Sequence, residues 1–431
     1  MNLPIVLVLA GGASRRFWPL RDKPLLEFAG VSLIARHLRV LRDLGVDRFV
    51  IVGRSESVLA LREIVSDLAL PQAHVVVQQE AQGMADAILS ARREIASMGG
   101  GPIYITQAQD VVSPELHRHL LEDWRRQPAG TFALIAASRV KSYFPGGYLT
   151  VAAGRVTSII EKPAAGQEPS DLVNIVAHCF GDWRPLMERL ELLTSQGGDD
   201  IYERALTSLM AEREFHAFPY EGRWQAIKYP WHVLDVMELL LEHWNAGSES
   251  LPDEYNGRGD GVFLGRDVRI FPGAHVVAPA IIGPGSVIGH NALVRGCLVG
   301  ANCVVGFGSE VARSYLAEGV QLHHNYVGDS ILDRDTLLGY GATTANFRLD
   351  NRAVPSIVDG QRVDTGRSKF GLVLGAGAKV GVNTSVMPGV KIGAGAVVGP
   401  GLVLSRDVPD GARVLTQLGA DRLTSKGDGR R

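Results

Sequence analysis

The sequence is poor in cysteine, has no excess of charge of one sign and contains no long apolar run. Its three cysteines, Cys179, Cys297 and Cys303, are too few for a disulfide framework, so we expect free thiols in a reducing compartment. A formal net charge of −2 offers no basic surface for nucleic acid. No apolar run approaches the ~20 residues that cross a bilayer, and no basic leader precedes the first apolar segment. We therefore expect a cytoplasmic protein with no membrane partner.

The first third of the chain alternates short β-rich runs with amphipathic stretches. At 431 residues and 46% hydrophobic composition, the chain is long enough for two or three domains. Strands are predicted at 5–10, 49–53, 74–78, 103–106 and 132–137, with helices such as 32–44 and 85–98 between them. This alternation predicts an α/β domain with a mostly parallel sheet and helices on both faces. Such sheets bind ligands at the carboxyl ends of their strands.

From about residue 262 the aliphatic residues recur every six positions. One register runs Leu264, Ile270, Val276, Ile282, Ile288 and Val294, then slips by one to Val299, Val305 and Val311; a second runs Leu374, Val380, Val386, Ile392, Val398 and Leu404. Glycine often follows the aliphatic residue, where it tolerates a tight corner. This period predicts a left-handed parallel β-helix of hexapeptide repeats. The alternative is a β-rich domain whose spacing is coincidental.

These patterns set the expected domain boundaries. We predict a nucleotide-binding domain at 1–244, a polar linker at 245–261, a β-helix at 262–410 and a frayed tail at 411–431. An interruption at 345–369 breaks the second half of the β-helix. Loops of that length in compact domains are usually functional or disordered, and this one has the length to reach a neighbouring subunit.

A glycine-rich turn follows the first predicted strand. The segment 9–30 reads LAGGASRRFWPLRDKPLLEFAG, so Gly11 and Gly12 permit close approach of a ligand to the backbone. Arg16 and Lys23 then supply fixed positive charge, which suits a triphosphate. Taken alone, the segment is equally compatible with a structural turn that carries solvated basic residues.

The wider pattern over the first 240 residues resembles the sugar-1-phosphate nucleotidylyltransferases, which open with L-A-G-G-x-G-T-R-L-x-P-L and P-K-P-L. The resemblance implies that Arg16 and Lys23 are catalytic and that Asp110 binds Mg²⁺. It assigns base recognition to Gln78, with Gly83 five residues later and Gly11 and Gly12 also at the substrate, and sugar-phosphate contacts to Gly147, Glu161, Lys162 and Asn174. Trp224 and Pro230 match the closing W-x-D-x-G-x-P motif. The implied substrates are a nucleoside triphosphate and a sugar 1-phosphate.

The chain departs from this family pattern at several positions. Smaller departures are Ser14 and Arg15 for Gly-Thr, Met84 for Thr, and Gln109 for Gly. The most serious is Ala226, which stands where the family usually has an Asp or Asn metal ligand, while Lys228 replaces the glycine two residues later. Mg²⁺ often binds proteins through one or two carboxylates, so Asp110, phosphate oxygens and water would be enough ligands to hold the ion. The alternative is that the absence of the second carboxylate abolishes nucleotidyl transfer.

A second resemblance lies in the β-helix, at HHNYVGD and the GYGATTANF segment that follows it. It is to the acetyltransferase half of the bifunctional enzymes that act on glucosamine 1-phosphate and N-acetylglucosamine 1-phosphate. The resemblance implies that His323 is the general base, Tyr326 contacts the sugar phosphate and Asn346 lies near the acyl donor, acetyl-CoA. A histidine near its ordinary pKa suits removal of a proton from an amino sugar. His324, directly adjacent, is the alternative base, and a surface histidine is the alternative role for either.

The prediction is thus a bifunctional enzyme, active as a homotrimer or a multiple of it through the β-helix. One alternative is a nucleotidylyltransferase whose β-helix is only a scaffold. Another is a catalytically weak regulatory or assembly subunit that binds a nucleotide sugar, which Ala226 and the altered glycine-rich turn favour. The sequence leaves the base and the sugar open.

Overall fold

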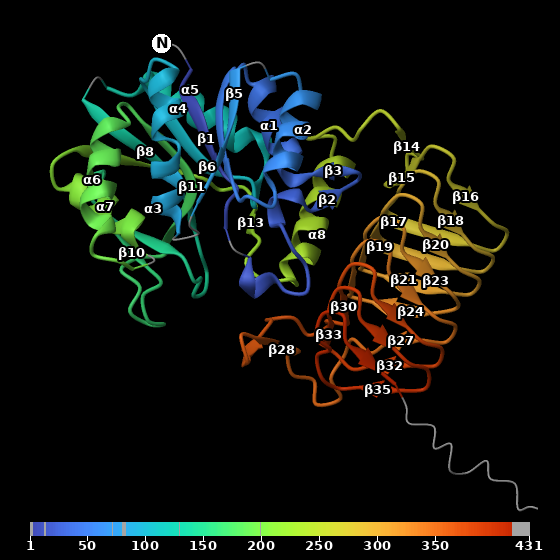
Figure 1. The fold of residues 1–431 in the computed structure, drawn as a ribbon. Helices are drawn as coiled ribbons and strands as arrows, with labels where there is room; N and C mark the ends of the chain where they lie inside the picture. Colours follow the sequence, from blue (N-terminus) through green and yellow to red (C-terminus); the bar gives the residue numbers. More distant parts are fainter. Residues whose placement is uncertain are drawn as a thin grey trace, which may run out of the picture. The chain divides into compact units, whose positions relative to one another are not determined.

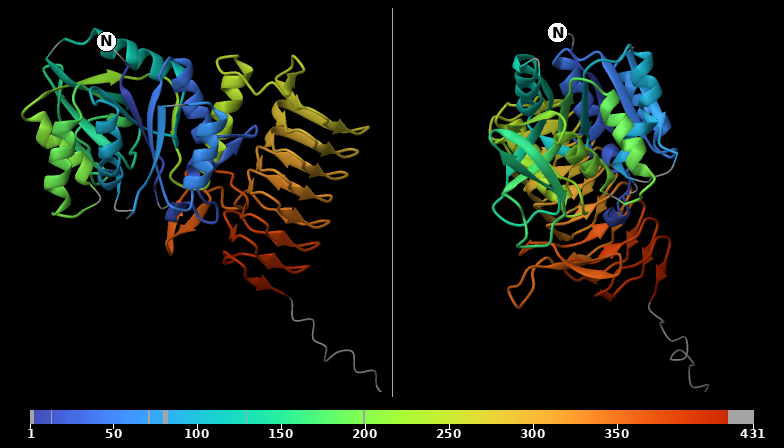
Figure 2. Two further views of the ribbon diagram at one scale, coloured as in Figure 1. Left: turned by 45° about the horizontal axis from the view of Figure 1, so that its top comes forward. Right: turned by 90° about the vertical axis from the view of Figure 1, so that its left-hand side faces the viewer.

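The chain forms two compact units, drawn as ribbons in Figures 1 and 2. The structure, a computed structural model, describes residues 3–12, 14–70, 72–79, 83–128, 130–198 and 200–415. The first unit contains the residues up to Arg15, those from 22 to 228 and those from 246 to 249. The second contains residues 16–21, 229–245 and those from 250 onward.

A mixed sheet forms the centre of the first unit, in the order β10-β9-β11-β6-β1-β4-β5, with β8 and β12 attached beside β11. The parallel part consists of β1 (Ile5–Leu9), β4 (Arg48–Gly53), β5 (Gln72–Val77) and β6 (Ile103–Gln107). All four strands were predicted, to within about two residues at each end. The aliphatic side chains of β1, β4 and β6 are buried on both faces, as parallel strands require, whereas those of the outermost strand, β5, are only partly buried.

The remaining strands make the sheet less parallel than the sequence predicted. They are β8 (Thr131–Arg139), β9 (Gly147–Ala152), β10 (Arg155–Glu161), β11 (Leu172–Phe180) and β12 (Glu214–Pro219). β11 runs antiparallel to β6, β8 and β9, and β9 and β10 form a hairpin. The turn at Ala153 and Gly154, both with positive φ, is short enough only for an antiparallel connection.

Helices cover both faces of the sheet, as predicted (Figure 1). One face packs against α3 (Met84–Ser90), α4 (Arg92–Ser97), α6 (Arg184–Thr194) and α7 (Ile201–Met210). The other packs against α1 (Leu33–Asp43), α2 (Val58–Asp67) and α5 (Pro114–Arg126). Shorter elements are η1 (Arg15–Phe17), η2 (Lys23–Leu25), β2 (Glu27–Phe28), β3 (Val31–Ser32), β7 (Asp110–Val112) and β13 (Trp224–Ala226). The helix predicted at 85–98 is divided at Ala91.

Stacked coils of short parallel strands form the second unit, a left-handed β-helix (Figure 2, left). One ladder contains β15 (Val262–Gly265), β17 (His275–Ile282), β19 (Leu293–Val299), β22 (Tyr315–Leu316), β25 (Ile331–Leu332), β30 (Val373–Leu374) and β33 (Lys391–Ile392). From β19 a second ladder continues through β21 (Glu310–Ala312), β24 (Tyr326–Gly328), β27 (Thr343–Thr344), β32 (Ser385–Val386) and β35 (Val403–Leu404). The third contains β16 (Arg269–Ile270), β18 (Val287–Ile288), β20 (Val304–Val305), β23 (Gln321–Leu322), β26 (Leu337–Leu338), β31 (Lys379–Val380), β34 (Val397–Val398) and β36 (Arg413–Val414).

The six-residue repeat buries its aliphatic side chains in the prism, except at the first coil. Val305, Val311, Leu374 and their later equivalents are buried, whereas Leu264 is partly buried and Ile270 is 38% exposed. Ile270 belongs to the first strand of its ladder, so no coil above it completes the cover. Glycines after the aliphatic residues are required sterically, because a Cβ on Gly306 would lie 2.4 Å from the carbonyl oxygen of Leu322 in the next coil.

The segments between the domains differ in part from the predicted linker and loop. α8 (His232–Asn245) packs on β17, β19 and β22, so its apolar face covers the β-helix. Within the predicted linker, β14 (Tyr255–Gly257) pairs with β15. The interruption at 345–369 contains a hairpin of β28 (Pro355–Val358) and β29 (Gln361–Asp364). In the predicted tail, β36 is ordered, and 416–431 lie outside the described residues.

The predicted thiols are confirmed as free and buried. Burial raises the pKa of Cys297 to about 11 and that of Cys303 to about 12, which makes both unreactive at neutral pH. In the part of the chain that the structure describes, no helix combines the length and the apolar character needed to cross a membrane.

Candidate functional site

The glycine-rich turn after β1 meets the end of β5 through Gly11 and Gln78. A Cβ at position 11 would lie 2.3 Å from Oε1 of Gln78, so a larger residue would displace this side chain. Gln78 is 6% exposed, and its amide nitrogen donates to the carbonyl oxygen of Gly83 at 3.1 Å and to Asp86 Oδ2 at 2.7 Å. Three residues predicted for the nucleotide end are therefore in contact. Asp86, which orients the Gln78 amide from the first turn of α3, was missed because the family motif does not include it.

Asp110 follows β6, at the carboxyl end of the parallel part of the sheet. It begins β7, which pairs antiparallel with β13 so that Ala226 lies opposite Asp110. Cross-strand partners have Cβ atoms ~5 Å apart on one face of the sheet. The position where the family carries its second carboxylate is thus beside Asp110, but it holds a methyl group.

Asp110 is partly buried, and its neighbours are cationic. Burial raises the pKa of its carboxyl to about 6, although the charges of Lys228 and Lys23 act in the opposite direction. Lys23 Nζ is 3.5 Å from the carbonyl oxygen of Lys228, so the two lysine segments meet at this point. Within the described ranges, no group of three or more His, Cys, Asp and Glu side chains is arranged to hold a metal.

The residues predicted for the sugar phosphate also come together. Gly147 pairs with Glu161 across the β9–β10 hairpin, and a Cβ on Gly147 would lie 2.7 Å from Nδ2 of Asn174. The backbone N–H of Lys162, a residue with φ of 45°, donates to the carbonyl oxygen of Gly146 at 3.0 Å. Lys162 Nζ is 3.1 Å from Glu161 Oε1.

Glu203 lies behind this hairpin and was not predicted. It is 7% exposed, and burial, with the charge of Glu161 as a second cause, raises the pKa of its carboxyl to about 7. The charge of Lys162 acts in the opposite direction. Nothing in the sequence marks Glu203, because α7 reaches the hairpin only in the folded chain.

The remaining predicted residues of the turn are accessible. Gly12 and Arg16 are exposed, and a Cβ on Gly12 would have no atom within 4 Å. The Arg16 guanidinium lies 5.7 Å from the centre of the Tyr229 ring, a contact within the second unit. Trp18 and Arg21 of the same segment both donate to the Asp410 carboxylate at 2.9 Å. The exposed Arg16 side chain therefore belongs to a segment that is held in place by the hydrogen bonds of Trp18 and Arg21 to Asp410.

In the β-helix, the side chains of Tyr326 and Asn346 are joined by a hydrogen bond. Asn346 Nδ2 donates to Tyr326 Oη at 3.2 Å and to the carboxylate of Asp329. Asp329, 2% exposed, also accepts two hydrogen bonds of 2.7 Å from the Arg313 guanidinium. Gly328 makes this network possible, because its Cβ would lie 2.6 Å from both Tyr326 Oη and Asn346 Nδ2. Arg313 and Asp329, which complete this hydrogen-bond network, were not predicted from the sequence.

His323 and His324 occupy one corner of the coil but differ in environment. His324 has φ of 54°, and its ring stacks on Phe307 at 6.0 Å and on Tyr340 at 5.0 Å between centroids. Its Nδ1 is 3.1 Å from the Phe307 carbonyl oxygen and so carries the proton. His323 is exposed, and its backbone N–H is bound by the buried Asn325 side chain. Both faces of the His324 ring are covered, whereas the His323 ring faces solvent.

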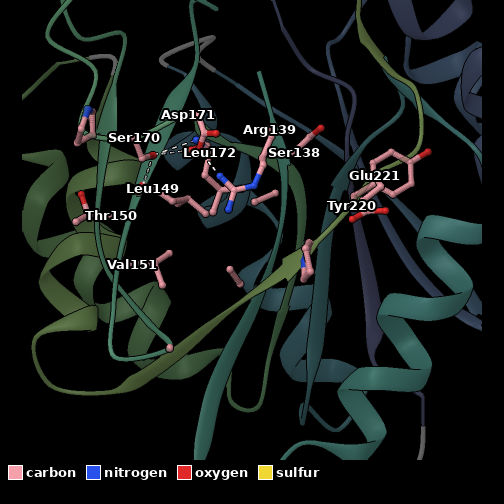
Figure 3. Close-up of a pocket in the computed structure, with 15 residues that line it drawn as sticks. Ser138, Arg139, Leu149, Thr150, Val151, Ser170, Asp171, Leu172, Tyr220 and Glu221 are labelled. Atoms are coloured by element: carbon pink, nitrogen blue, oxygen red, sulfur yellow. Dashed lines mark hydrogen bonds and ion pairs between the residues drawn. The ribbon is translucent and has the colours of Figure 1, made fainter. Parts of the chain in front are cut away.

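A separate cavity of about 600 Å³ lies among β8, β9, β12 and the start of β11 (Figure 3). Arg139 and Asp171, which form an ion pair, are part of its lining. None of the described residues predicted for either site lines it. It is therefore distinct from the nucleotide end.

The sheet, the glycine-rich turn and the Asp110 loop define the first unit as a nucleotidyltransferase domain. Residues 6–242 match the MobA-like NTP transferase domain, and the chain belongs to that family. Residues 261–296 and 371–406 match the six-repeat bacterial transferase hexapeptide family, so the β-helix is of the transferase type.

Relatives named as bifunctional proteins match nearly the whole chain. A bifunctional sugar-1-phosphate nucleotidylyltransferase/acetyltransferase of Sulfurisphaera tokodaii is 27% identical, with 93% of this chain and 97% of that protein covered. The bifunctional protein GlmU of Methanocaldococcus jannaschii is also 27% identical, with coverages of 93% and 95%. Among solved structures, apo UDP-glucose pyrophosphorylase superposes with a TM-score of 0.47 at 18% identity, over 56% of this chain and 99% of that one.

Proposed function

We propose that the chain is a bifunctional enzyme that acetylates an amino-sugar 1-phosphate and couples a sugar 1-phosphate to a nucleotide. The observation that carries the proposal is that three predicted groups lie at the ends of strands of the first unit. Gly11 with Gln78, Asp110, and Gly147 with Asn174 all lie at strand ends of the first unit. The matches to relatives with both activities over nearly the whole chain agree with this assignment.

In the nucleotidyl reaction, a phosphate oxygen of the sugar 1-phosphate attacks the α-phosphorus of the triphosphate. The bond from the α-phosphorus to the bridging oxygen breaks, and pyrophosphate leaves with the electron pair. The reactants are polyanions, so fixed cations rather than a covalent nucleophile lower the barrier. Lys23 orients and neutralises the α-phosphate, and Arg16 stabilises the departing pyrophosphate.

The residues at Asp110 fit a magnesium ion with few protein ligands. Asp110 would hold Mg²⁺ together with phosphate oxygens and water, an arrangement that this ion commonly adopts. When bound, Mg²⁺ supplies Lewis-acid stabilisation of the phosphate charge. Gln78, held by Gly83 and Asp86, would present its carbonyl oxygen to the base.

In acetyl transfer, His323 accepts a proton from the sugar ammonium group, and the free amine attacks the thioester carbon of acetyl-CoA. The carbon–sulfur bond then breaks, and the coenzyme A thiolate takes up a proton. Tyr326 would contact the sugar phosphate, and Asn346 would lie near the acyl donor. The hydrogen bond between their side chains would hold these two contacts next to each other. The His324 ring, stacked on two aromatic neighbours, acts as a support for the corner. The coils from 374 to 404 would form the coenzyme A groove.

We further propose a cytoplasmic homotrimer, or a multiple of it, assembled through the β-helix. The flat faces of the prism and the hairpin β28–β29 offer surfaces for a neighbouring subunit. Analytical ultracentrifugation at micromolar concentration tests this, and a stable monomer would contradict it.

The experiment for the function is an assay of purified full-length protein against a panel of triphosphates and sugar 1-phosphates. Pyrophosphate release reports the first activity, and acetyl-CoA offered with amino-sugar 1-phosphates reports the second. Nucleotide-sugar binding without turnover would instead support a regulatory or assembly subunit, and nucleotidyl transfer alone would support a scaffold β-helix.

A further inference from the structure

Five strands of the first unit curl so that the two outermost of them meet. They pair in the order β12, β8, β11, β9 and β10. Across the gap between the outer strands, Arg155 Nη2 of β10 is 3.1 Å from Glu214 Oε1 of β12. His216 Nδ1 of β12 donates to the carbonyl oxygen of Gly154, in the turn between β9 and β10, at 3.2 Å. The curled strands therefore form part of a barrel, and the mouths of barrels are common ligand sites.

The cavity of about 600 Å³ lies among these strands, and its size is within the range of small-molecule sites (Figure 3). Residues two apart on three strands line it, and each such pair lies on one face of its strand: Ala137 and Arg139, Leu149 and Val151, Ala217 and Pro219. Protein interiors are normally filled to high density. Alanine at 137 and at 217, on the adjacent strands β8 and β12, leaves this space unfilled.

The polar groups of the cavity are held by the backbone around them. Arg139 pairs with Leu172 in the β8–β11 register, and the backbone N–H of Val140 donates to the carbonyl oxygen of Asp171 at 2.8 Å. Ser170 Oγ donates to the carbonyl oxygen of Leu149 on β9 at 2.6 Å and accepts from the Leu172 N–H at 3.0 Å. The ion pair of Arg139 and Asp171 is therefore fixed at one side of the cavity.

The opposite side of the cavity is also fixed, and it is partly aromatic. Figure 3 shows Tyr220 and Glu221 across from Arg139 and Asp171. Tyr220 Oη accepts from the Ser113 N–H at 3.2 Å and donates to the carbonyl oxygen of Arg223 at 3.0 Å. With its hydroxyl group occupied at both ends, Tyr220 contributes an immobile ring to the lining.

The composition of the lining selects the class of ligand. The cation of Arg139 is compensated by Asp171, and Glu221 adds a second negative charge, so a phosphate or carboxylate group gains nothing here. A guanidinium group only donates hydrogen bonds and a carboxylate only accepts them, whereas a hydroxyl group does both. Neighbouring hydroxyl groups of one ligand therefore match the two partners together. Leu149 and Val151, the latter 44% exposed, provide an apolar surface beside them.

We propose that this cavity binds an uncharged saccharide. Arg139 and Asp171 hold its hydroxyl groups, while its C–H face packs on the apolar residues of β9. The cavity contains none of the described residues assigned to either reaction, so the saccharide occupies a site of its own. The inference goes beyond the proposed function and does not depend on it.

The test is a titration of the full-length protein with D-glucose, N-acetyl-D-glucosamine, maltose and lactose, followed by calorimetry and by methyl NMR of leucine and valine. The methyl signals of Leu149, Val151 and Leu172 should shift with saccharide concentration, and those of Val305 in the β-helix should not. Arg139→Met should raise the dissociation constant ~10-fold or more, the loss expected for hydrogen bonds to a charged group. Arg184→Met, which removes an exposed arginine paired with Asp182 outside the lining, is the matched control and should bind as the wild type does.

The inference is overturned if none of these saccharides shifts the three sets of methyl signals, or if Arg139→Met binds no more weakly than Arg184→Met. Tighter binding of glucose 6-phosphate than of glucose at the same methyl groups would also overturn it, because the cavity would then prefer an anion. Should Arg139→Met fail to fold, Val151→Trp makes the comparison, since an indole at this exposed position would fill the cavity and abolish the shifts of Leu149 and Leu172. The readout needs no turnover, so absence of nucleotidyl or acetyl transfer would count against the proposed function alone.

Discussion

Ala226 lies directly opposite Asp110 in the antiparallel pair of β13 and β7, so a side chain at 226 shares a face with the carboxylate assigned to the metal. The strand geometry of a two-carboxylate site is therefore retained, although one carboxylate is missing. Restoring a carboxylate at position 226 is therefore a direct test of the proposed metal site.

Ala226→Asp should tighten Mg²⁺ binding, because it restores a carboxylate ~5 Å from Asp110 across the strand pair. The Mg²⁺ concentration for half-maximal pyrophosphate release should fall by about tenfold, since even outer ligands change metal affinity that much. Mn²⁺ binding followed by electron paramagnetic resonance provides a readout that does not depend on turnover. Gln225→Asp, which puts the same charge on the other face, is the control. An unchanged metal dependence in a folded Ala226→Asp protein would show that the loop lacks the required geometry.

His323→Ala should lower acetyl transfer ~10²–10⁴-fold, the usual loss on removal of a general base. Nucleotidyl transfer should not change, because none of the residues assigned to that reaction lies within the coils from 262 to 415. His324→Ala should lower the thermal midpoint instead, since it removes the ring stacked on Phe307 and Tyr340. Loss of acetyl transfer in His324→Ala with full activity in His323→Ala would reverse the assignment.

Gly328→Ala should reduce acetyl transfer without affecting nucleotidyl transfer. The added methyl group would overlap Tyr326 Oη and Asn346 Nδ2, both 2.6 Å away, and so separate the two side chains. Steady-state kinetics should show a higher KM for the amino-sugar 1-phosphate or for acetyl-CoA. Tyr326→Phe, which removes only the hydroxyl from the same network, should show a smaller change. Wild-type kinetics for a folded Gly328→Ala would mean that the Tyr326–Asn346 contact is dispensable.

Glu203→Gln should flatten the pH dependence of stability. The folded-state pKa of Glu203, about 7, lies above its ordinary value of 4.5, so folding favours the protonated form. Its contribution is fully present below pH ~4.5 and is lost as the pH rises through ~7, on the order of 3 kcal/mol. Calorimetric midpoints at pH 5 and 8 should therefore converge in Glu203→Gln. The exposed Glu188→Gln on α6 should keep the wild-type difference, and identical profiles for all three proteins would contradict the prediction.

The repeating parts of the fold could be predicted because their signals are local. An aliphatic residue every six positions with glycine beside it specifies a coil corner wherever it occurs, and Val305 and Leu374 are buried as the period requires. The strands of the parallel sheet were found for the same reason, since each is a short apolar run. The mixed character of the sheet was missed, because the direction of β11 depends on how the chain returns to β6.

The candidate site divides in the same way. The sequence by itself determined which residues are available, including Gln78, Asp110 and Asn346, because their motifs are contiguous in the chain. Only the tertiary structure decided that Ala226 faces Asp110, that Glu203 lies behind Glu161 and that Lys228 docks on the Pro145 turn. The physical reason is that these relationships join segments far apart in sequence, which local patterns of residue type cannot register. They arise only when strands pair and helices pack, and these contacts determine the environment of the ionisable groups at the site.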